Sequence, residues 1–191
     1  MKTITIVGIG ALGSHVAQFL RNVAQLRVVD FDRVEQQNVL SQFHSRSSLG
    51  RAKVVALQQT MSFLFGTKIE AIPHKLAEGN AAELLARADL VLDCLDNAAA
   101  RRLVQRFAGA HGVPCLHGAL AADGSFGQVI WDDDFTPDTE PEAGAATCED
   151  GAHLPLIGLV AAYLARSAQE FLTNNRKLAF GVPARGAATF L

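Results

Sequence analysis

The chain has 191 residues, of which 49% are hydrophobic and 19% charged, so it is long and apolar enough for one folded domain and is not intrinsically disordered. Its 17 lysines and arginines against 19 aspartates and glutamates give a formal charge of −2, which excludes the strongly basic surface of a nucleic-acid-binding protein. The three cysteines are widely spaced and form no Cys-x-x-Cys pair, so neither a disulfide framework nor a paired-cysteine zinc site is predicted.

The first half of the chain alternates between strand-like and helix-like segments. Residues 3–7 are β-branched and end at a glycine, which is typical of a strand, and apolar residues then recur at helical spacing over residues 12–23. The same signals predict strands at residues 26–30, 68–74, 90–94 and 113–116, and helices at residues 54–64, 81–87 and 98–110. This alternation predicts an α/β fold, a Rossmann-like open sheet with a parallel core and helices on both faces.

A long polar segment, residues 31–50, separates the second strand from the next helix. Connections of this length inside a compact domain are usually functional or disordered. We therefore expect this segment to contribute to the functional site.

The pattern changes near Gly124. Residues 127–131 predict a strand, and residues 177–191 predict a weak terminal strand, so antiparallel strands are expected at the C-terminal end of the sheet. Between them lies an acidic, proline- and glycine-rich stretch, which we interpret as a solvated crossover loop at about residues 132–152, with a docking surface for a basic partner as the alternative. Residues 1–191 are expected to form a single nucleotide-binding domain.

A long apolar helix is predicted over residues 154–172. Its most apolar part, residues 154–165, contains a proline and a glycine and is too short to span a bilayer. The N-terminal residues lead directly into the first strand, which predicts no signal peptide, so we expect a cytoplasmic protein with no membrane partner. Four apolar residues on this helix are expected to form a homodimer face: Leu156, Leu159, Val160 and Tyr163.

The first motif is a glycine-rich turn. Gly8, Gly10 and Gly13 form Gly-x-Gly-x-x-Gly between a strand and a helix, and Asp30 ends the next strand. Glycines let backbone N–H groups approach phosphates, and an acidic side chain at the second strand can accept hydrogen bonds from ribose hydroxyls. The combination predicts an adenine nucleotide, and an NAD-dependent oxidoreductase would need only these residues.

Further polar residues favour ATP over NAD. Asp32, Asn38 and Gln42 follow the second strand, Lys53 opens a helix, and Asp96 and Asn97 follow a buried strand. A nucleotidyltransferase uses such groups: lysine neutralises phosphate charge, aspartate holds Mg²⁺, and amides orient the triphosphate. Two structural alternatives stay open, because Asp96 and Asn97 could only cap a helix and Lys53 could be an ordinary solvated lysine.

These motifs occur in the order typical of one superfamily. The glycine turn is followed by Asp-x-Asp-x-Val-Glu-x-x-Asn, Gly-x-x-Lys and Asp-x-x-Asp-Asn-x-x-x-Arg, and residues 124–129 and 148–158 also agree. The chain thus resembles the ThiF/MoeB/HesA superfamily, the relatives of ubiquitin-activating enzymes. The resemblance implies ATP-dependent adenylation of the C-terminal carboxylate of a small ubiquitin-like or sulfur-carrier protein ending in Gly-Gly, in a homodimer or a heterodimer. A small molecule, a peptide or a modified tRNA is the alternative acceptor within the superfamily.

The resemblance also implies roles for individual residues. Ala11 would contribute backbone beside the phosphates, Asp30 would bind the ribose, and Lys53 would contact phosphate oxygens. Asp96 would hold Mg²⁺, which makes Asp96 and Lys53 the candidate catalytic residues. The remaining nucleotide-binding positions would be Gly8, Gly10, Gly13, Asp32, Asn38, Gln42 and Asn97.

The sequence departs from this superfamily in two ways. Ser41 stands where the family usually has an arginine that touches the phosphates, and Arg46 or Arg51 could compensate from the same segment. The two Cys-x-x-Cys pairs of the family's zinc site are missing, and the six histidines have no spacing suited to metal ligation, so no structural zinc is expected. A catalytically weak partner subunit is therefore an alternative to an active enzyme.

The cysteines differ in what they predict. Cys148 occupies the position at which sulfur-transferring relatives place a cysteine, so it is a candidate nucleophile for the activated acyl group, with a buried loop-end residue as the alternative. Cys94 and Cys115 lie in predicted strands and are expected in the core.

Overall fold

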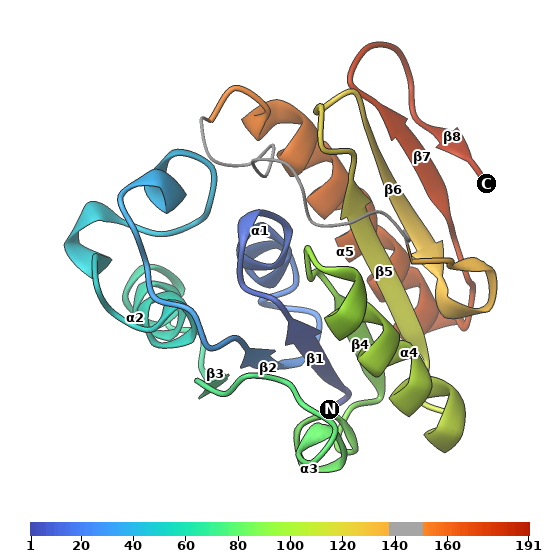
Figure 1. The fold of residues 1–191 in the computed structure, drawn as a ribbon, viewed down its shortest axis with the longest axis horizontal. Coiled ribbons are helices and arrows are strands. Elements are labelled where there is room, and N and C mark those ends of the chain that lie inside the picture. Colours follow the sequence, from blue (N-terminus) through green and yellow to red (C-terminus); the bar gives the residue numbers. More distant parts are fainter. Residues whose placement is uncertain (138–150) are drawn as a thin grey trace.

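A computed structural model describes residues 1–137 and 151–191 and contains one mixed sheet (Figure 1). The strand order is β3-β2-β1-β4-β5-β6-β7-β8. Neighbouring strands from β3 to β5 run parallel, and those from β5 to β8 run antiparallel, as the sequence predicted. The strands are β1 (Thr3–Val7), β2 (Gln25–Val29), β3 (Ile69–Ile72), β4 (Leu90–Asp93), β5 (Cys115–Leu120), β6 (Phe126–Trp131), β7 (Phe180–Pro183) and β8 (Thr189–Phe190).

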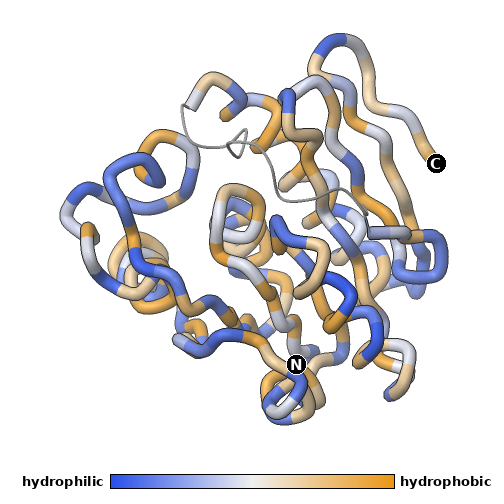
Figure 2. Tube along the Cα trace, in the orientation of Figure 1, coloured by the Kyte–Doolittle hydropathy of each residue, from blue (hydrophilic) through white to orange (hydrophobic). Residues whose placement is uncertain are grey.

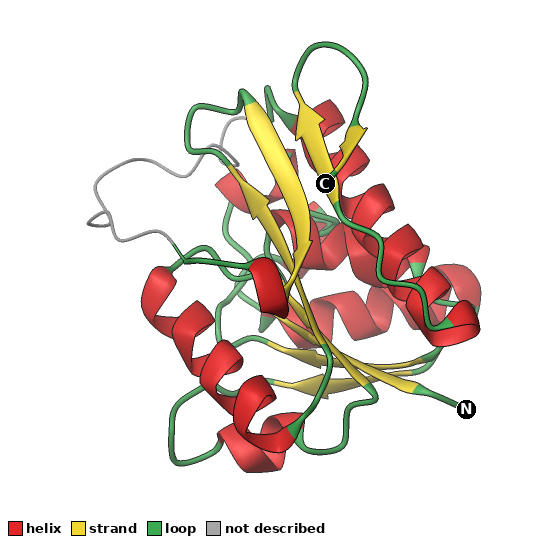
Figure 3. Ribbon diagram, turned by 90° about the vertical axis from the view of Figure 1, so that its right-hand side faces the viewer, coloured by secondary structure: helices red, strands yellow, loops and turns green. Residues whose placement is uncertain are grey.

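Helices cover both faces of this sheet (Figure 3). One face packs against α1, α2 and α5, and the other against α3 and α4, so the sheet separates two hydrophobic clusters. The helices are α1 (Ala11–Phe19), α2 (Lys53–Phe65), α3 (Ala81–Leu85), α4 (Ala98–His111) and α5 (Leu154–Asn174).

The central strands are buried on both sides, which explains their nearly continuous apolar sequences. In β1, Ile4 and Ile6 belong to the cluster with α1, α2 and α5, whereas Val7 belongs to the cluster with α3 and α4. Figure 2 shows apolar residues along these strands and hydrophilic residues along the segment that follows β2. Among the described residues, no helix has the length and apolar character needed to cross a bilayer.

The predicted dimer face on α5 is wrong for two of its four residues. Leu156 and Val160 are buried within the chain itself, where α5 packs on the antiparallel strands β5 and β6. A Cβ atom at Gly127 would lie only 2.3 Å from Val160 Cγ2, so the strand and the helix are in close contact. Leu159 is exposed and Tyr163 half-buried, so the apolar stripe of α5 mainly reflects intramolecular packing.

Three other segments differ in detail from the prediction. Residues 177–191 contain the two strands β7 and β8, because the chain turns at Gly186 and pairs Phe180 with Phe190. The polar segment after β2 contains two short 3-10 helices, η1 (Gln37–Leu40) and η2 (Arg46–Ser48). The acidic stretch begins with a third, η3 (Asp132–Asp134), and residues 138–150 lie outside the described residues.

Candidate active site

The strand order places a topological switch point between β1 and β4, because the chain continues from β1 to β2 on one side and from β4 to β5 on the other. Ligands of open α/β sheets bind in the crevice outside the carboxyl ends of the strands at such a point. The glycine-rich turn follows β1, and residues 94–97 follow β4. The two segments are in contact, since a Cβ atom at Gly8 would lie 3.1 Å from the Leu95 backbone nitrogen.

The three glycines of the turn have different structural roles. Gly8 has a φ of +89°, and a Cβ there would lie 2.8 Å from the Cys94 carbonyl oxygen. A Cβ at Gly13 would lie 1.8 Å from the Gly8 carbonyl oxygen, so both positions require glycine for packing. At Gly10 the nearest atom is Gln42 Nε2 at 4.0 Å. Gly10 therefore leaves open space in front of the N-terminus of α1, where a phosphate would gain from the helix dipole and free N–H groups.

This difference predicts opposite effects for two matched substitutions. Gly10→Ala is expected to leave the urea-unfolding midpoint nearly unchanged and to weaken ATP binding at least tenfold in calorimetry, because the methyl group would fill the open space that we expect a phosphate to occupy. Gly13→Ala is expected to destabilise the fold by about 3 kcal/mol, because its methyl group meets backbone rather than a flexible side chain. Unchanged ATP affinity in a folded Gly10→Ala protein would contradict this assignment.

Asp30 ties the glycine turn to the segment after β2. Its carboxylate accepts hydrogen bonds from the Ile9 N–H at 2.6 Å and the Asp32 N–H at 2.8 Å. Burial raises the pKa of Asp30 above its usual range, although these hydrogen bonds and the Lys53 ammonium oppose that rise. Each carboxylate oxygen keeps a second lone pair, so the group can also accept from ribose hydroxyls.

Lys53 is the first residue of α2 and its side chain is only 9% exposed, so the alternative of a solvated lysine is wrong. Its Nζ lies 3.0 Å from Asp32 Oδ2, and its backbone N–H donates to the Asp32 carbonyl at 2.8 Å. The Asp32 side chain is about half exposed. A buried ammonium held by a carboxylate that water can solvate is well placed to exchange that partner for a phosphate oxygen.

Among the other polar side chains of this segment, some form hydrogen bonds and some have no partner among the described residues. Asn38 is buried, and its Oδ1 accepts from the Glu35 N–H at 2.8 Å, so it shapes the turn. Gln42 Oε1 and His44 Nδ1 are buried without a hydrogen-bond partner among the described residues. Buried polar atoms are normally paired, so two orphaned atoms beside the glycine turn indicate a site for a polar ligand.

His44 was missed by sequence reasoning, because no spacing or motif singles it out. Its Nε2 lies 3.2 Å from the Ile9 carbonyl, to which it must donate. Burial lowers the pKa of His44 to about 4, so the ring is neutral at pH 7 and its Nδ1, which has no partner among the described residues, is an acceptor. Ser41 is also buried, and its carbonyl accepts from His15 Nε2 at 3.0 Å.

Asp96 and Asn97 have separate roles at the start of α4. Asn97 Oδ1 accepts from the Ala100 N–H at 2.8 Å and caps the helix. Asp96 is exposed, and none of the hydrogen bonds among the described residues uses its carboxylate. The capping alternative thus applies to Asn97, while the Asp96 carboxylate is free to act as the oxygen ligand that Mg²⁺ prefers.

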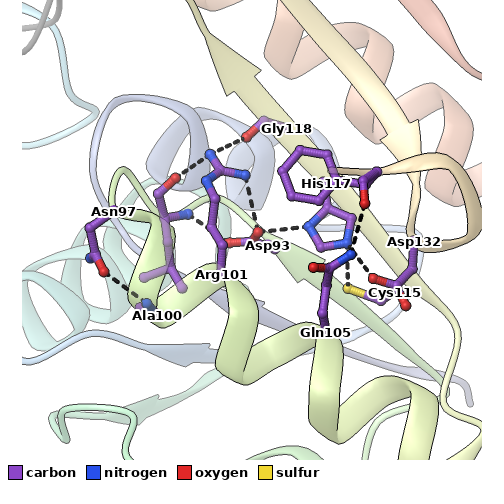
Figure 4. Close-up of polar contacts among 11 residues, drawn as sticks. Asp93, Asn97, Ala100, Arg101, Gln105, Cys115, His117, Gly118 and Asp132 are labelled. Carbon is purple, nitrogen blue, oxygen red and sulfur yellow. Dashed lines mark hydrogen bonds and ion pairs between the residues drawn. The ribbon is translucent and has the colours of Figure 1, made fainter. Parts of the chain in front are cut away.

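Arg101 organises the end of β4 from the buried side, where only 8% of the residue is exposed. Its Nη1 lies 3.0 Å from Asp93 Oδ2, and its Nη2 donates to the Leu95 carbonyl and, at 2.9 Å, to the Gly118 carbonyl (Figure 4). Asp93 Oδ1 in turn accepts from the Leu95 N–H at 2.9 Å. These bonds fix the backbone that presents Asp96.

The remaining predicted residues lie elsewhere. Arg46 and Arg51 are exposed, and the Arg51 guanidinium donates to Gln59 on α2. Cys148 lies outside the described residues, so its role as a nucleophile stays a prediction. Cys94 and Cys115 are buried, as expected.

Comparison with known proteins places the chain in a family. Residues 1–184 match the ThiF family. The chain is also 32% identical over 198 residues to the molybdopterin-synthase adenylyltransferase of Escherichia coli, covering 96% of this chain and 76% of that protein. The chain belongs to the ThiF family.

Other relatives of this ThiF-family chain are longer proteins. It is 32% identical to the adenylyltransferase and sulfurtransferase UBA4 of Lodderomyces elongisporus and 31% identical to MOCS3 of Dictyostelium discoideum, and these matches cover 90% and 92% of this chain. The chain spans only 40% and 44% of the length of those two proteins. The crystal structure of E. coli MccB with ATP has the same fold, with a TM-score of 0.79 at 13% identity over the whole chain and 63% of MccB.

Proposed function

We propose that this ThiF-family chain is an ATP-dependent adenylyltransferase that activates the C-terminal carboxylate of a small ubiquitin-like or sulfur-carrier protein ending in Gly-Gly. In this reaction a carboxylate oxygen of the carrier forms a bond to the α-phosphorus of ATP. The bond from that phosphorus to the bridging oxygen breaks, and pyrophosphate leaves with the bonding electrons. The product is an acyl-adenylate, a mixed anhydride.

The chain's own residues supply what such a displacement needs, which is mainly positioning and charge neutralisation. The open backbone at Gly10 and Ala11 would hold phosphate oxygens, Asp30 would orient the ribose, and the Lys53 ammonium would neutralise phosphate charge. Asp96 would hold Mg²⁺, which supplies further positive charge to the triphosphate when bound. The orphaned Gln42 Oε1 and His44 Nδ1 would accept hydrogen bonds from the nucleotide or its bound water.

One observation supports this function above the others: a buried lysine and an unengaged aspartate flank an open glycine turn at the crevice between β1 and β4. An NAD-dependent oxidoreductase needs the glycine turn and Asp30 but has no use for this pair. The names of the relatives, adenylyltransferases for molybdopterin synthase and sulfur carriers, support the same reaction.

Calorimetry and pyrophosphate exchange test the proposal together. We expect the protein to bind ATP with Mg²⁺ in preference to NAD, and to exchange labelled pyrophosphate into ATP only when a Gly-Gly carrier is present. A carrier lacking the terminal glycine is the matched control. Micromolar binding of NAD without binding of ATP would overturn the proposal.

A second candidate, a nucleotide-binding partner subunit with weak activity of its own, is favoured by Ser41 at the usual arginine position. A missing arginine of this kind can lower a phosphoryl-transfer rate on the order of 10³-fold. In that case the pure protein binds ATP but barely exchanges pyrophosphate, and a co-expressed partner restores the exchange. Full activity of the pure protein would exclude this candidate.

A further inference from the structure

A second cluster of reactive side chains lies on β5 and at the end of β6 (Figure 4). Cys115 and His117 are two residues apart on β5, so their side chains point to the same face of the sheet. The antiparallel ladder pairs Leu116 with Trp131, which places Asp132, the next residue, beside Cys115. Two neighbouring strands therefore bring a thiol, an imidazole and a carboxylate together.

The three donor atoms are grouped closely enough for one metal ion to reach all of them. His117 Nε2 lies 3.6 Å from Cys115 Sγ and 2.9 Å from Asp132 Oδ1, and the three atoms all lie within 4.8 Å of one another. Zinc binds sulfur at about 2.3 Å and nitrogen or oxygen at about 2.0–2.2 Å, so tetrahedral donors are separated by roughly 3.3–3.6 Å. Small shifts of the partly exposed Asp132 side chain would complete this geometry.

The other nitrogen of His117 is held as in known metal sites. His117 Nδ1 lies 2.7 Å from Asp93 Oδ2, and Asp93 is itself paired with Arg101. A histidine that ligates a metal almost always donates its second N–H to such a carboxylate, which fixes the ring and its tautomer. With the proton on Nδ1, the lone pair of Nε2 points toward Cys115 and Asp132.

The cluster is also enclosed by the fold. The Cys115 thiol and the His117 ring are buried, and Phe135 stacks on the His117 ring with 4.0 Å between the ring centroids. A metal ion at this point would engage the thiolate, the imidazole and the carboxylate together, and Phe135 would shield it on one side.

We propose that Cys115, His117 and Asp132 bind one divalent transition metal ion, with Zn²⁺ as the best match to a sulfur, nitrogen and oxygen ligand set. Cys115 would lose its thiol proton to solvent on binding, and a water molecule would occupy the fourth position. The Asp132 side chain, 24% exposed, provides access from solvent. This site differs from the paired-cysteine zinc site whose absence led us to expect no zinc, and it is separate from the Mg²⁺ position at Asp96.

The test uses the full chain after removal of metals by a chelator. Titration with Co²⁺ is expected to reach one ion per chain and to produce near-ultraviolet absorption from thiolate-to-cobalt charge transfer, which Zn²⁺ then abolishes. Cys115→Ala and Asp132→Asn are expected to weaken binding at least 100-fold. Cys94→Ala, which removes another buried thiol, is the matched control and should bind normally, and Cys148→Ala excludes that thiol as the ligand.

Circular dichroism shows whether each variant is folded. Asp132→Asn is the mildest of these substitutions, because asparagine has nearly the same size and shape as aspartate. Failure of the folded parent protein to bind Co²⁺ or Zn²⁺, or unchanged binding in folded Asp132→Asn, would overturn the proposal. So would NMR evidence that both ring nitrogens of His117 remain protonated in the presence of excess Zn²⁺. Excess Mg²⁺ should not displace the cobalt, whereas displacement would place the ion at Asp96.

Discussion

Replacing Asp96 by alanine is expected to lower carrier-dependent pyrophosphate exchange on the order of 10³-fold while the free energy of unfolding changes by less than about 1 kcal/mol. The physical reason is that the carboxylate is exposed and unengaged within the described residues, whereas Asn97 caps α4. Loss of Asp96 would remove the proposed Mg²⁺ ligand without removing a hydrogen bond of the described residues. Steady-state exchange and urea unfolding measure the two effects.

The control for this substitution is at the opposite end of the same strand. Asp89 precedes β4 and pairs with Lys2 and the Thr3 N–H, far along the strand from the crevice. Asp89→Ala removes one carboxylate and a structural hydrogen bond, so it should lower stability modestly and leave exchange close to the parent value. Comparable exchange by Asp96→Ala and the parent would show that Asp96 holds no catalytic ion.

Replacing Lys53 by methionine is expected to weaken ATP binding and to lower exchange on the order of 10²-fold or more. Methionine fills most of the buried volume of the lysine but carries no charge for the phosphates. The substitution leaves the Asp32 carboxylate unpaired, yet about half of that side chain is in contact with water, so the fold should lose little stability. Exchange kinetics at several ATP concentrations separate an effect on KM from one on kcat.

Lys2→Met is the matched control, since Lys2 also forms a lysine–aspartate pair but precedes the central strand β1, at the end of that strand opposite the glycine turn, and is 62% exposed. It should leave both kinetic parameters unchanged. If Lys53→Met loses stability but keeps its affinity for ATP, Lys53 serves only to anchor α2. Lys53→Arg then distinguishes charge from shape, because it keeps the charge and changes the geometry of contact with phosphate.

Local sequence signals predicted the parts of the site that depend on neighbouring residues. The glycine turn, Asp30 and the order of strands and helices follow from spacing and composition within a few residues. The burial of Lys53 and Arg101 could not be predicted in this way, because each is enclosed by segments distant in sequence. The prediction that Val160 belongs to a dimer face failed for the same reason. Val160 packs against Gly127, which is distant in sequence.

The unpredicted groups share a physical cause. His44 becomes a candidate site residue because the fold places its ring against the Ile9 carbonyl. The grouping of Cys115, His117 and Asp132 depends on the register of two antiparallel strands. A shift of one residue in that register would point Asp132 to the opposite face. The register between two strands is set when the sheet folds, and the spacing of residues in the sequence does not reveal it.

The ends of the segment after β2 are joined beside the crevice. The Val34 N–H donates to the Arg51 carbonyl at 2.8 Å, Arg33 pairs with Ala52, and Asp32 meets Lys53 through both backbone and side chain. The intervening stretch is thus a loop whose two ends are held together. The position of Lys53 is set by these end contacts and does not depend on the length of the loop. Under the proposed function, exchanging exposed residues of this stretch, such as Arg46, would alter the surface offered to a carrier protein without moving Lys53. The segment is therefore the place where carrier recognition could be re-engineered separately from nucleotide binding.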